Sequence, residues 1–215
     1  MSESLDQLSV LVETDEAHVV VSDLDGVLRR FDQELWEQLD EELGAAPGTS
    51  FAAILGHPFL EEVTRGRGTH AQWRRHAAEQ LASGSIDPAL ARRAVDRWAS
   101  TPAQVDQEVL ELLQSFRARG IEVFVFTNGT DRVPEELDEL GLTDFIGLNG
   151  RSLLNSADLG AAKPERAAFE GAHQRIERIT GEQLAPRRIA FLDDSSRHVR
   201  AAREFGWAGI EHRPA

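Results

Sequence analysis

The chain has 215 residues, and its 37 acidic against 23 basic residues give a formal net charge of −14 with histidine neutral. This length is enough to bury a proper core, and the acidic excess argues against non-specific binding to nucleic acid. Because the chain has no cysteine, a disulfide scaffold, a thiolate zinc site and a cysteine nucleophile are all excluded.

The first ten residues, MSESLDQLSV, lack the basic start and the apolar stretch of a signal peptide. No apolar run approaches the roughly 20 residues of a membrane helix. We therefore expect a soluble, cytoplasmic protein with neither a membrane nor a nucleic acid as partner. The oligomeric state is unknown at this stage.

Three short runs are apolar at nearly every residue, which is typical of strands buried on both faces of a parallel sheet. These runs are residues 18–22, 121–126 and 188–192. Amphipathic helical patterns cover residues 105–119, 165–180 and 197–205. Strands that alternate with helices predict an α/β fold, with a Rossmann-like core and a mainly parallel sheet.

The interval between Asp23 and Val105 breaks this alternation. It holds about 80 residues without a further convincing strand, whereas a crossover between parallel strands needs on the order of a dozen residues. Helical patterns within it cover residues 33–43, 51–63, 69–82 and 88–98. We predict an inserted all-helical cap at 32–104, with 1–31 and 105–215 forming the α/β catalytic core. An extended helical flank of one domain is the alternative.

Polar residues follow each predicted strand, at the edge of the sheet where open α/β folds bind their ligands. They are Asp23, Asp25 and Gly26 after the first strand, Thr127, Asn128 and Gly129 after the second, and Asp193 and Asp194 after the third; Lys163 precedes a helix. Each signal alone is ordinary in turns and caps. Four carboxylates on one rim, however, would repel each other unless a cation lay among them, and such oxygen ligands suit Mg²⁺. A hydroxyl and an ammonium beside that cation make a site for a phosphoryl group.

In this order, the motifs Asp-X-Asp-Gly, Thr-Asn, Lys-Pro and Asp-Asp resemble those of the haloacid dehalogenase (HAD) superfamily. The resemblance covers residues 18–210, and the insert falls where that superfamily places its helical cap. Within the superfamily the chain is similar to the phosphatase group with a helical cap. The resemblance implies a Mg²⁺-dependent phosphoric monoester hydrolase that acts on a small phosphorylated metabolite, such as a sugar phosphate, through an aspartyl-phosphate intermediate.

The resemblance also implies a role for each motif residue in catalysis. Asp23 would be the nucleophile, and Asp25 would protonate the leaving oxygen and later take a proton from the attacking water. Lys163 would neutralise the nucleophile and the phosphate.

Phosphate oxygens would be held by Thr127 and by the amide of Asn128 or Gly129. His198 stands where this group often has Asn. The ligands implied for Mg²⁺ are Asp23, the backbone carbonyl of Asp25, Asp193 and Asp194, the last bound directly or supporting the other ligands.

Other functions of the same constellation stay open. A 2-haloacid dehalogenase would use the same nucleophile on carbon, but those enzymes typically lack a residue in the place of Asp25. A sugar-phosphate mutase would carry a His near Leu35, where this chain has none. A catalytically silent binding protein would have lost motif residues, and a receiver domain would lack the long insert.

The insert is expected to contribute the contacts that distinguish one substrate from another. Residues 63–78 contain four Arg and two His but no acid, so Arg65 and Arg67 are candidates to bind an anionic or hydroxylated substrate. A solvated charged face is the simpler interpretation. Trp36, close in sequence to the Asp23 loop, is a candidate to face the leaving group. The natural substrate itself cannot be named from these residues.

Overall fold

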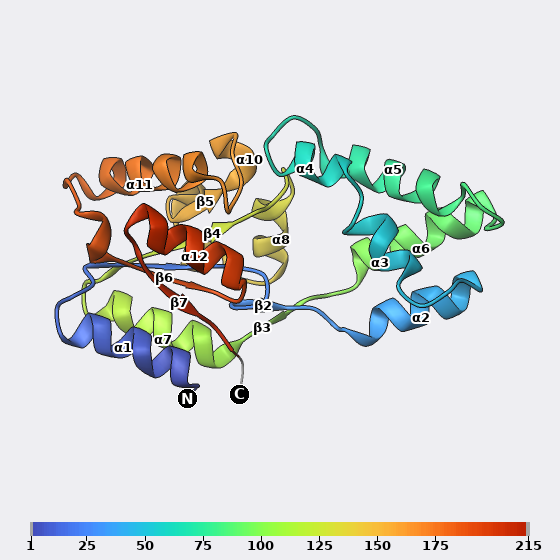
Figure 1. Ribbon diagram of the computed structural model, residues 1–215. Coiled ribbons are helices and arrows are strands. Elements are labelled where there is room, and N and C mark those ends of the chain that lie inside the picture. Colours follow the sequence, from blue (N-terminus) through green and yellow to red (C-terminus); the bar gives the residue numbers. More distant parts are fainter. Residues whose placement is uncertain (1, 214–215) are drawn as a thin grey trace.

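The computed structural model describes residues 2–213 and has a parallel sheet at the centre of its larger lobe (Figure 1). Within these residues the sheet has five strands in the order β5-β4-β1-β6-β7, and all neighbouring pairs run parallel. The strands are β1 (Val19–Ser22), β4 (Glu122–Thr127), β5 (Leu153–Asn155), β6 (Ile189–Asp193) and β7 (Ala208–Glu211). The predicted α/β fold with a Rossmann-like parallel core is therefore confirmed.

Helices cover both faces of this sheet, because successive strand residues point to opposite sides. Val20 belongs to one hydrophobic cluster, whereas Val19 and Val21 belong to the other. The first face is covered by α1 (Glu3–Glu13), α7 (Gln107–Ala118), α8 (Val133–Glu139) and α9 (Thr143–Ile146). The second is covered by α11 (Arg166–Thr180) and α12 (Ser196–Phe205). The short elements between them are η1 (Leu148–Gly150), α10 (Ser156–Leu159) and η2 (Pro186–Arg188).

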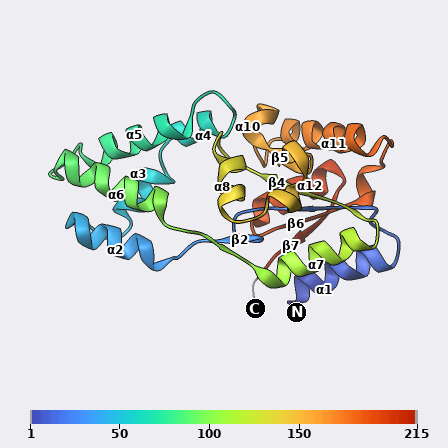
Figure 2. The same ribbon diagram turned by 180° about the vertical axis from the view of Figure 1, so that it is seen from behind.

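The smaller lobe consists of the helices between β1 and α7, seen from both sides in Figures 1 and 2. They are α2 (Glu34–Leu43), α3 (Thr49–Ile54), α4 (Phe59–Val63), α5 (His70–Leu81) and α6 (Pro88–Ser100). Their apolar faces form a hydrophobic cluster of their own, which includes Leu39, Ile54 and Trp73. The indole Nε1 of Trp73 donates to the carbonyl of Ile54 at 2.8 Å, so Trp73 is a core residue of this lobe.

Two short strands connect the lobes. They are β2 (Arg29–Arg30) and β3 (Gln104–Val105), and they pair antiparallel, with Arg29 opposite Val105. The path into the helical insert and the path out of it therefore run side by side, next to the end of β1. Among the helices described, none combines the length and the apolar composition that crossing a bilayer requires.

One predicted element is wrong. The helix expected over 51–63 is two helices, α3 and α4, because Gly56-His57-Pro58 interrupts it. The residue before a proline is disfavoured in helical conformation, and a proline has no N–H to continue the helical ladder. The amide of Phe59 instead donates a hydrogen bond to Nδ1 of His57, 3.0 Å away, and a new helix begins.

Candidate active site

The carboxyl ends of the central strands bring a buried lysine between two buried aspartates. Asp23 follows β1 and Asp193 ends β6, its neighbour in the sheet. The Nζ of Lys163 lies 2.9 Å from Oδ1 of Asp23 and 2.7 Å from Oδ2 of Asp193. It also donates to the carbonyl of Phe126 at 2.9 Å. All three protons of this ammonium are thus engaged, and Lys163 is the only lysine of the chain.

Burial and neighbouring charges shift the pKa values of this cluster in different directions. Burial raises the pKa of Asp23 well above its usual value against the opposing charge of Lys163, and repulsion from Asp193 adds to the rise. Burial also acts to raise the pKa of Asp193, but Lys163 and the hydrogen bond from His198 outweigh it and lower that pKa. Burial acts to lower the pKa of Lys163, and the two aspartates reverse this and raise it. Lys163 therefore stays charged, while Asp23 resists ionisation.

Asp194 turns toward the loop that follows β1. A Cβ built on Gly26 would lie 2.0 Å from Oδ2 of Asp194, so this carboxylate occupies the space that any side chain at residue 26 would need. Gly26 also has a φ of +79°, which favours glycine. Burial raises the pKa of Asp194, and the charge of Asp193 adds to it. The Asp-X-Asp-Gly motif and the Asp-Asp motif thus meet through Gly26 and Asp194.

These residues fit a divalent cation. Asp23, Asp193 and His198 offer ligand atoms that all lie within 4.8 Å of one another. Three carboxylates, counting Asp194, face one ammonium, which leaves two negative charges unbalanced when all are ionised. The Nδ1 of His198 lies 3.1 Å from Oδ1 of Asp193 and orients that carboxylate. The donor set is dominated by carboxylate oxygens, which suit Mg²⁺.

The Thr127-Asn128-Gly129 turn at the end of β4 supports the lysine. The Asn128 side chain donates to the backbone carbonyl of Lys163 at 2.7 Å and accepts from its amide at 2.8 Å. This reciprocal pair anchors the Lys163 loop, a role that the sequence analysis missed. A Cβ on Gly129 would lie 2.3 Å from Cγ2 of Val133, so glycine is required there. Thr127 is buried at the same strand end as the cluster.

Asp25 does not lie free beside Asp23. Its carboxylate accepts two hydrogen bonds from Arg29, from Nε to Oδ1 at 2.6 Å and from Nη2 to Oδ2 at 3.1 Å. The remaining Nη1 of Arg29 donates to Oε2 of Glu136 on α8 at 2.7 Å. Arg29 is a further residue of the site that the sequence motifs do not single out, and its only signal is a position four residues after Asp25.

The candidates in the insert have other partners. Arg65 donates from Nε to Oε1 of Glu165 at 2.8 Å, and Arg67 donates from Nε to Oε2 of Glu62 at 2.7 Å. Trp36 packs edge-on against the exposed ring of Phe51, with centroids 5.2 Å apart. The two arginines are thus engaged by carboxylates, whereas Trp36 belongs to a partly exposed aromatic pair.

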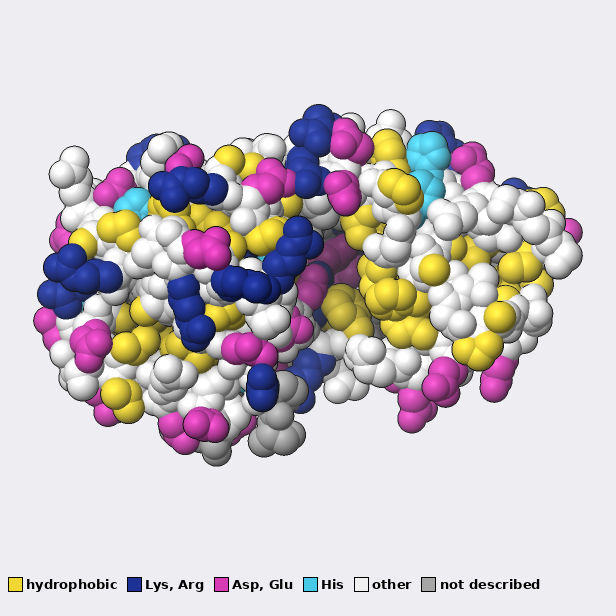
Figure 3. Space-filling model, viewed as in Figure 1, with side chains coloured by type: hydrophobic (Ala, Val, Ile, Leu, Met, Phe, Trp, Pro, Cys, Tyr) yellow, Lys and Arg dark blue, Asp and Glu magenta, His cyan; other side chains and the backbone are white. Residues whose placement is uncertain are grey.

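The loop before α5 rests on the larger lobe. A Cβ on Gly66 would lie 2.3 Å from the carbonyl oxygen of Ala157 in α10, so the two backbones approach closely. The amide of His70 donates to Oδ1 of Asp131 at 2.6 Å. Figure 3 shows a hollow between the lobes, with acidic side chains deep in it and hydrophobic side chains on the wall that the insert provides.

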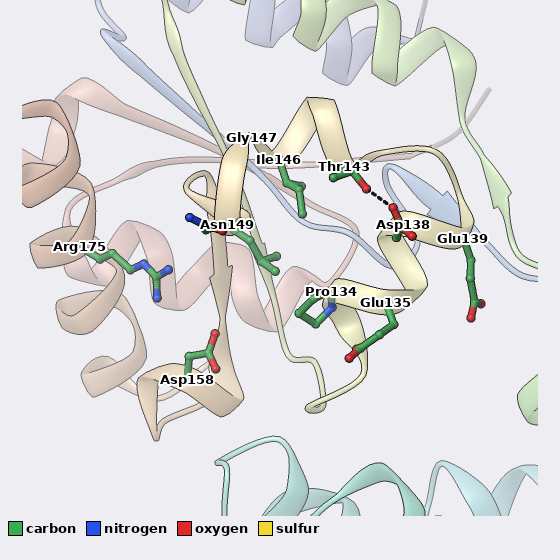
Figure 4. A pocket seen from close by; sticks show the side chains of 12 residues that line it. Pro134, Glu135, Asp138, Glu139, Thr143, Ile146, Gly147, Asn149, Asp158 and Arg175 are labelled. Carbon is green, nitrogen blue, oxygen red and sulfur yellow. Dashed lines mark hydrogen bonds between the residues drawn. The ribbon is translucent and has the colours of Figure 1, made fainter.

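A separate cavity of about 460 Å³ lies on the larger lobe, beside α8 and η1 (Figure 4). Asp138 accepts a hydrogen bond from the Thr143 hydroxyl at 2.6 Å on its wall, and the side chains of Asp158 and Arg175 extend toward it. Its lining includes none of the residues that the sequence motifs single out. The candidate site therefore rests on the strand-end cluster.

A known protein family matches most of the chain. The family model described as haloacid dehalogenase-like hydrolase matches residues 17–206. An uncharacterised hydrolase of Schizosaccharomyces pombe is 25% identical over 126 residues, which cover 56% of this chain. The match spans 54% of that relative's length, about half.

Solved structures share the fold. A HAD family enzyme of Bacteroides thetaiotaomicron, in complex with magnesium and inorganic phosphate, is 18% identical with a TM-score of 0.66, covering 92% of this chain and 94% of the other. The L-2-haloacid dehalogenase of Xanthobacter autotrophicus, with chloropropionic acid covalently bound, is 16% identical with a TM-score of 0.60, covering 89% and 75%. At these identities the likeness concerns the fold alone. The matched part of this chain includes residues of both the larger and the smaller lobe.

Proposed function

Because the chain belongs to the haloacid dehalogenase-like hydrolase family, we propose that it is a Mg²⁺-dependent phosphatase. Its substrate would be a small phosphorylated metabolite, such as a sugar phosphate, and the reaction would pass through an aspartyl phosphate. The observation that carries the proposal is the pair of carboxylates on one loop in two different environments. Asp23 is buried against Lys163, whereas Asp25 is 45% exposed beside Arg29.

The first step would transfer the phosphoryl group to Asp23. An Oδ of Asp23 forms a bond to phosphorus, and the bond from phosphorus to the leaving oxygen breaks with its electron pair on that oxygen. Asp25 gives this oxygen a proton, so that the product leaves as a neutral alcohol. Thr127 and the amides of Asn128 and Gly129 would hold the other phosphate oxygens.

The second step would release inorganic phosphate. Asp25, now ionised, takes a proton from water, whose oxygen attacks phosphorus while the bond to Asp23 breaks. Lys163 stabilises the Asp23 carboxylate as it re-forms. Mg²⁺, held by Asp23, the Asp25 carbonyl, Asp193 and Asp194, would shield the phosphate from these carboxylates and stabilise its developing charge.

The insert would act as the cap that sets specificity, since the larger lobe can bind the phosphoryl group of any substrate. Trp36 would contribute an aromatic surface there, since an indole has no ionic partner to give up. Arg65 and Arg67 would have to give up Glu165 and Glu62 before they could bind a substrate.

Dehalogenation of a 2-haloacid is the alternative, because an L-2-haloacid dehalogenase shares the fold. That reaction expels a halide, which needs no proton, so it gives Asp25 no task and calls for no divalent cation. Phosphoryl transfer uses both. A mutase is disfavoured, because residue 35, where its acid–base His would stand, is a leucine buried in the core of the insert.

The experiment compares the two reactions on one preparation. Release of phosphate from p-nitrophenyl phosphate and of chloride from 2-chloropropionate is measured with Mg²⁺ and with EDTA, for the wild type and Asp23→Asn. We expect phosphate release that requires Mg²⁺ and Asp23, and no chloride release. Chloride release with no need for metal would overturn the proposal. A screen of phosphorylated metabolites ranked by kcat/KM would then identify the substrate.

A further inference from the structure

Arg29 is buried at a place where a charged side chain is costly. Its side chain is only 7% exposed, although it stands on β2, the first connection to the insert. Its guanidinium donates hydrogen bonds to two carboxylates, those of Asp25 and Glu136. Its face also lies over the ring of Phe31, 5.0 Å from the centroid. The guanidinium is therefore held on three sides, in one orientation.

The backbone holds Arg29 and Asp25 in one tight loop. The amide of Arg29 donates to the carbonyl of Leu24 at 2.7 Å, and the amide of Gly26 donates to the carbonyl of Arg29 at 2.9 Å. The Arg29 side chain thus folds back onto the carboxylate of its own loop. The backbone hydrogen bonds fix the loop, and the two hydrogen bonds from the forked guanidinium of Arg29 fix the Asp25 side chain. Arg29 therefore determines the direction of the Asp25 carboxylate.

The two hydrogen bonds from Arg29 leave the Asp25 carboxylate free to accept and donate a proton. A carboxylate offers about four lone-pair positions on its two oxygens, and Arg29 uses one position on each. One position on each oxygen stays available for a proton. A fixed plane with a free acceptor is what an acid–base group needs in order to meet a leaving oxygen in the right geometry.

We propose that Arg29 is a positioning residue that aims the Asp25 carboxylate at the leaving oxygen through its two-point hydrogen bond, with Glu136 holding the far side of the guanidinium. This inference rests on the proposed function. Arg29 itself touches no reacting atom. The insert is attached through β2, so the residue that positions the acid also begins the connection to the lobe that would hold the leaving group.

The chain offers a matched control in the next residue. Arg30 stands on the same two-residue strand, is largely exposed at 47%, and pairs with Asp106 at the start of α7. It shares the charge and the strand of Arg29 but has no contact with Asp25 among those described. An effect of the strand or of net charge would appear in Arg30→Ala as well.

The test uses two aryl phosphates of nearly the same shape and different leaving groups. p-Nitrophenolate leaves without help, whereas phenolate depends on a proton from the acid. The kcat/KM of each substrate reports the steps up to the phosphorylation of Asp23. The measured quantity is kcat/KM for p-nitrophenyl phosphate divided by that for phenyl phosphate, with a thermal melt for each variant.

We expect Arg29→Ala to raise this ratio by about ten- to a hundredfold, because general acid catalysis contributes roughly 10²–10⁴ and Asp25 keeps part of this contribution when its direction is no longer fixed. Arg29→Lys keeps the charge but cannot form the fork, so it should also raise the ratio. Glu136→Gln should do so more weakly, and it keeps the test available if the Arg29 variants fold poorly. Arg30→Ala should leave the ratio within about twofold.

The Asp25→Asn variant tests whether Arg29 acts through the Asp25 carboxylate. In Asp25→Asn, the addition of Arg29→Ala should change the ratio no further, because the arginine acts only through that carboxylate. Equal losses on both substrates, or a further change in the Asp25→Asn background, would overturn the positioning role while leaving the phosphatase proposal in place. A wild type that releases no phosphate from either ester would overturn the function, and the positioning role with it.

Discussion

Replacement of Lys163 by methionine tests the electrostatic basis of the site. The substitution shortens the side chain by one atom and removes the ion pairs with Asp23 and Asp193 and the hydrogen bond to the carbonyl of Phe126. Two buried carboxylates then face each other without a cation. Breaking a buried ion pair costs about 3–5 kcal/mol, which for a domain of this size corresponds to a fall in Tm of roughly 6–20 °C.

Magnesium should reverse part of this loss. With EDTA, Lys163→Met is expected to show the full fall in Tm, and saturating Mg²⁺ should raise its Tm by more than it raises that of the wild type. Binding to the folded state alone stabilises it by mass action, and the ion would supply the charge that the lysine no longer provides. The assay is a thermal melt followed by circular dichroism, with and without Mg²⁺.

Arg166→Met is the matched control, because this exposed cation lies three residues further on and pairs with Glu170 at the surface. It should change the free energy of unfolding by less than about 0.5 kcal/mol. As Lys163 is the only lysine and is fully buried, an amine-reactive label should also spare it in the folded protein. A Tm within 2 °C of the wild type by the melt, or ready labelling of Lys163, would refute the reasoning.

Three further predictions concern the loop after β1, the buried His212 that follows β7, and the insert. Gly26→Ala should destabilise by about 1–3 kcal/mol, since the positive φ strains any side chain, and should raise the Mg²⁺ concentration needed for half-maximal activity, since the added Cβ displaces Asp194; an unchanged requirement would contradict this. Burial lowers the pKa of His212, so below about pH 6.5 the unfolded chain takes up a proton that the folded chain refuses, and stability should fall by at most about 1.4 kcal/mol per pH unit from this group. His212→Gln should flatten that slope in urea melts. Arg65→Ala should change the ratio of kcat/KM for the best metabolite to that for acetyl phosphate by less than about twofold, because Glu165 holds the guanidinium; a loss confined to the metabolite would assign Arg65 to substrate binding.

The central strands were predictable because their residues carry the pattern of a doubly buried strand. Residues 19–22 are three valines and a serine, all buried in the structure. The outer strands carry no such pattern, since β5 has three residues and β7 reads Ala-Gly-Ile-Glu. The helix α1 does carry a signal, in the spacing of Leu5, Leu8 and Val12, which are all buried on one face.

The convergence of Asp23, Lys163 and Asp193 was predictable because the carboxyl ends of parallel strands meet at one edge of the sheet. The direction of a side chain was not. Asn128 lies in a motif expected to hold phosphate through its backbone amide, yet its side chain clamps the Lys163 loop. Arg29 lies four residues from Asp25, and only the fold of the loop shows that its fork turns back onto that carboxylate.

The most direct measurement of the central claim is a search for a phosphoryl group on Asp23 during turnover. The wild type and Asp25→Asn are mixed with p-nitrophenyl phosphate and Mg²⁺, quenched in acid within one turnover, and digested for mass spectrometry. We predict one added phosphoryl group on the peptide that contains Asp23, a larger fraction of it in Asp25→Asn, and none with EDTA or in Asp23→Asn. Rapid phosphate release by a wild type that never carries a phosphoryl group on this peptide would contradict the account.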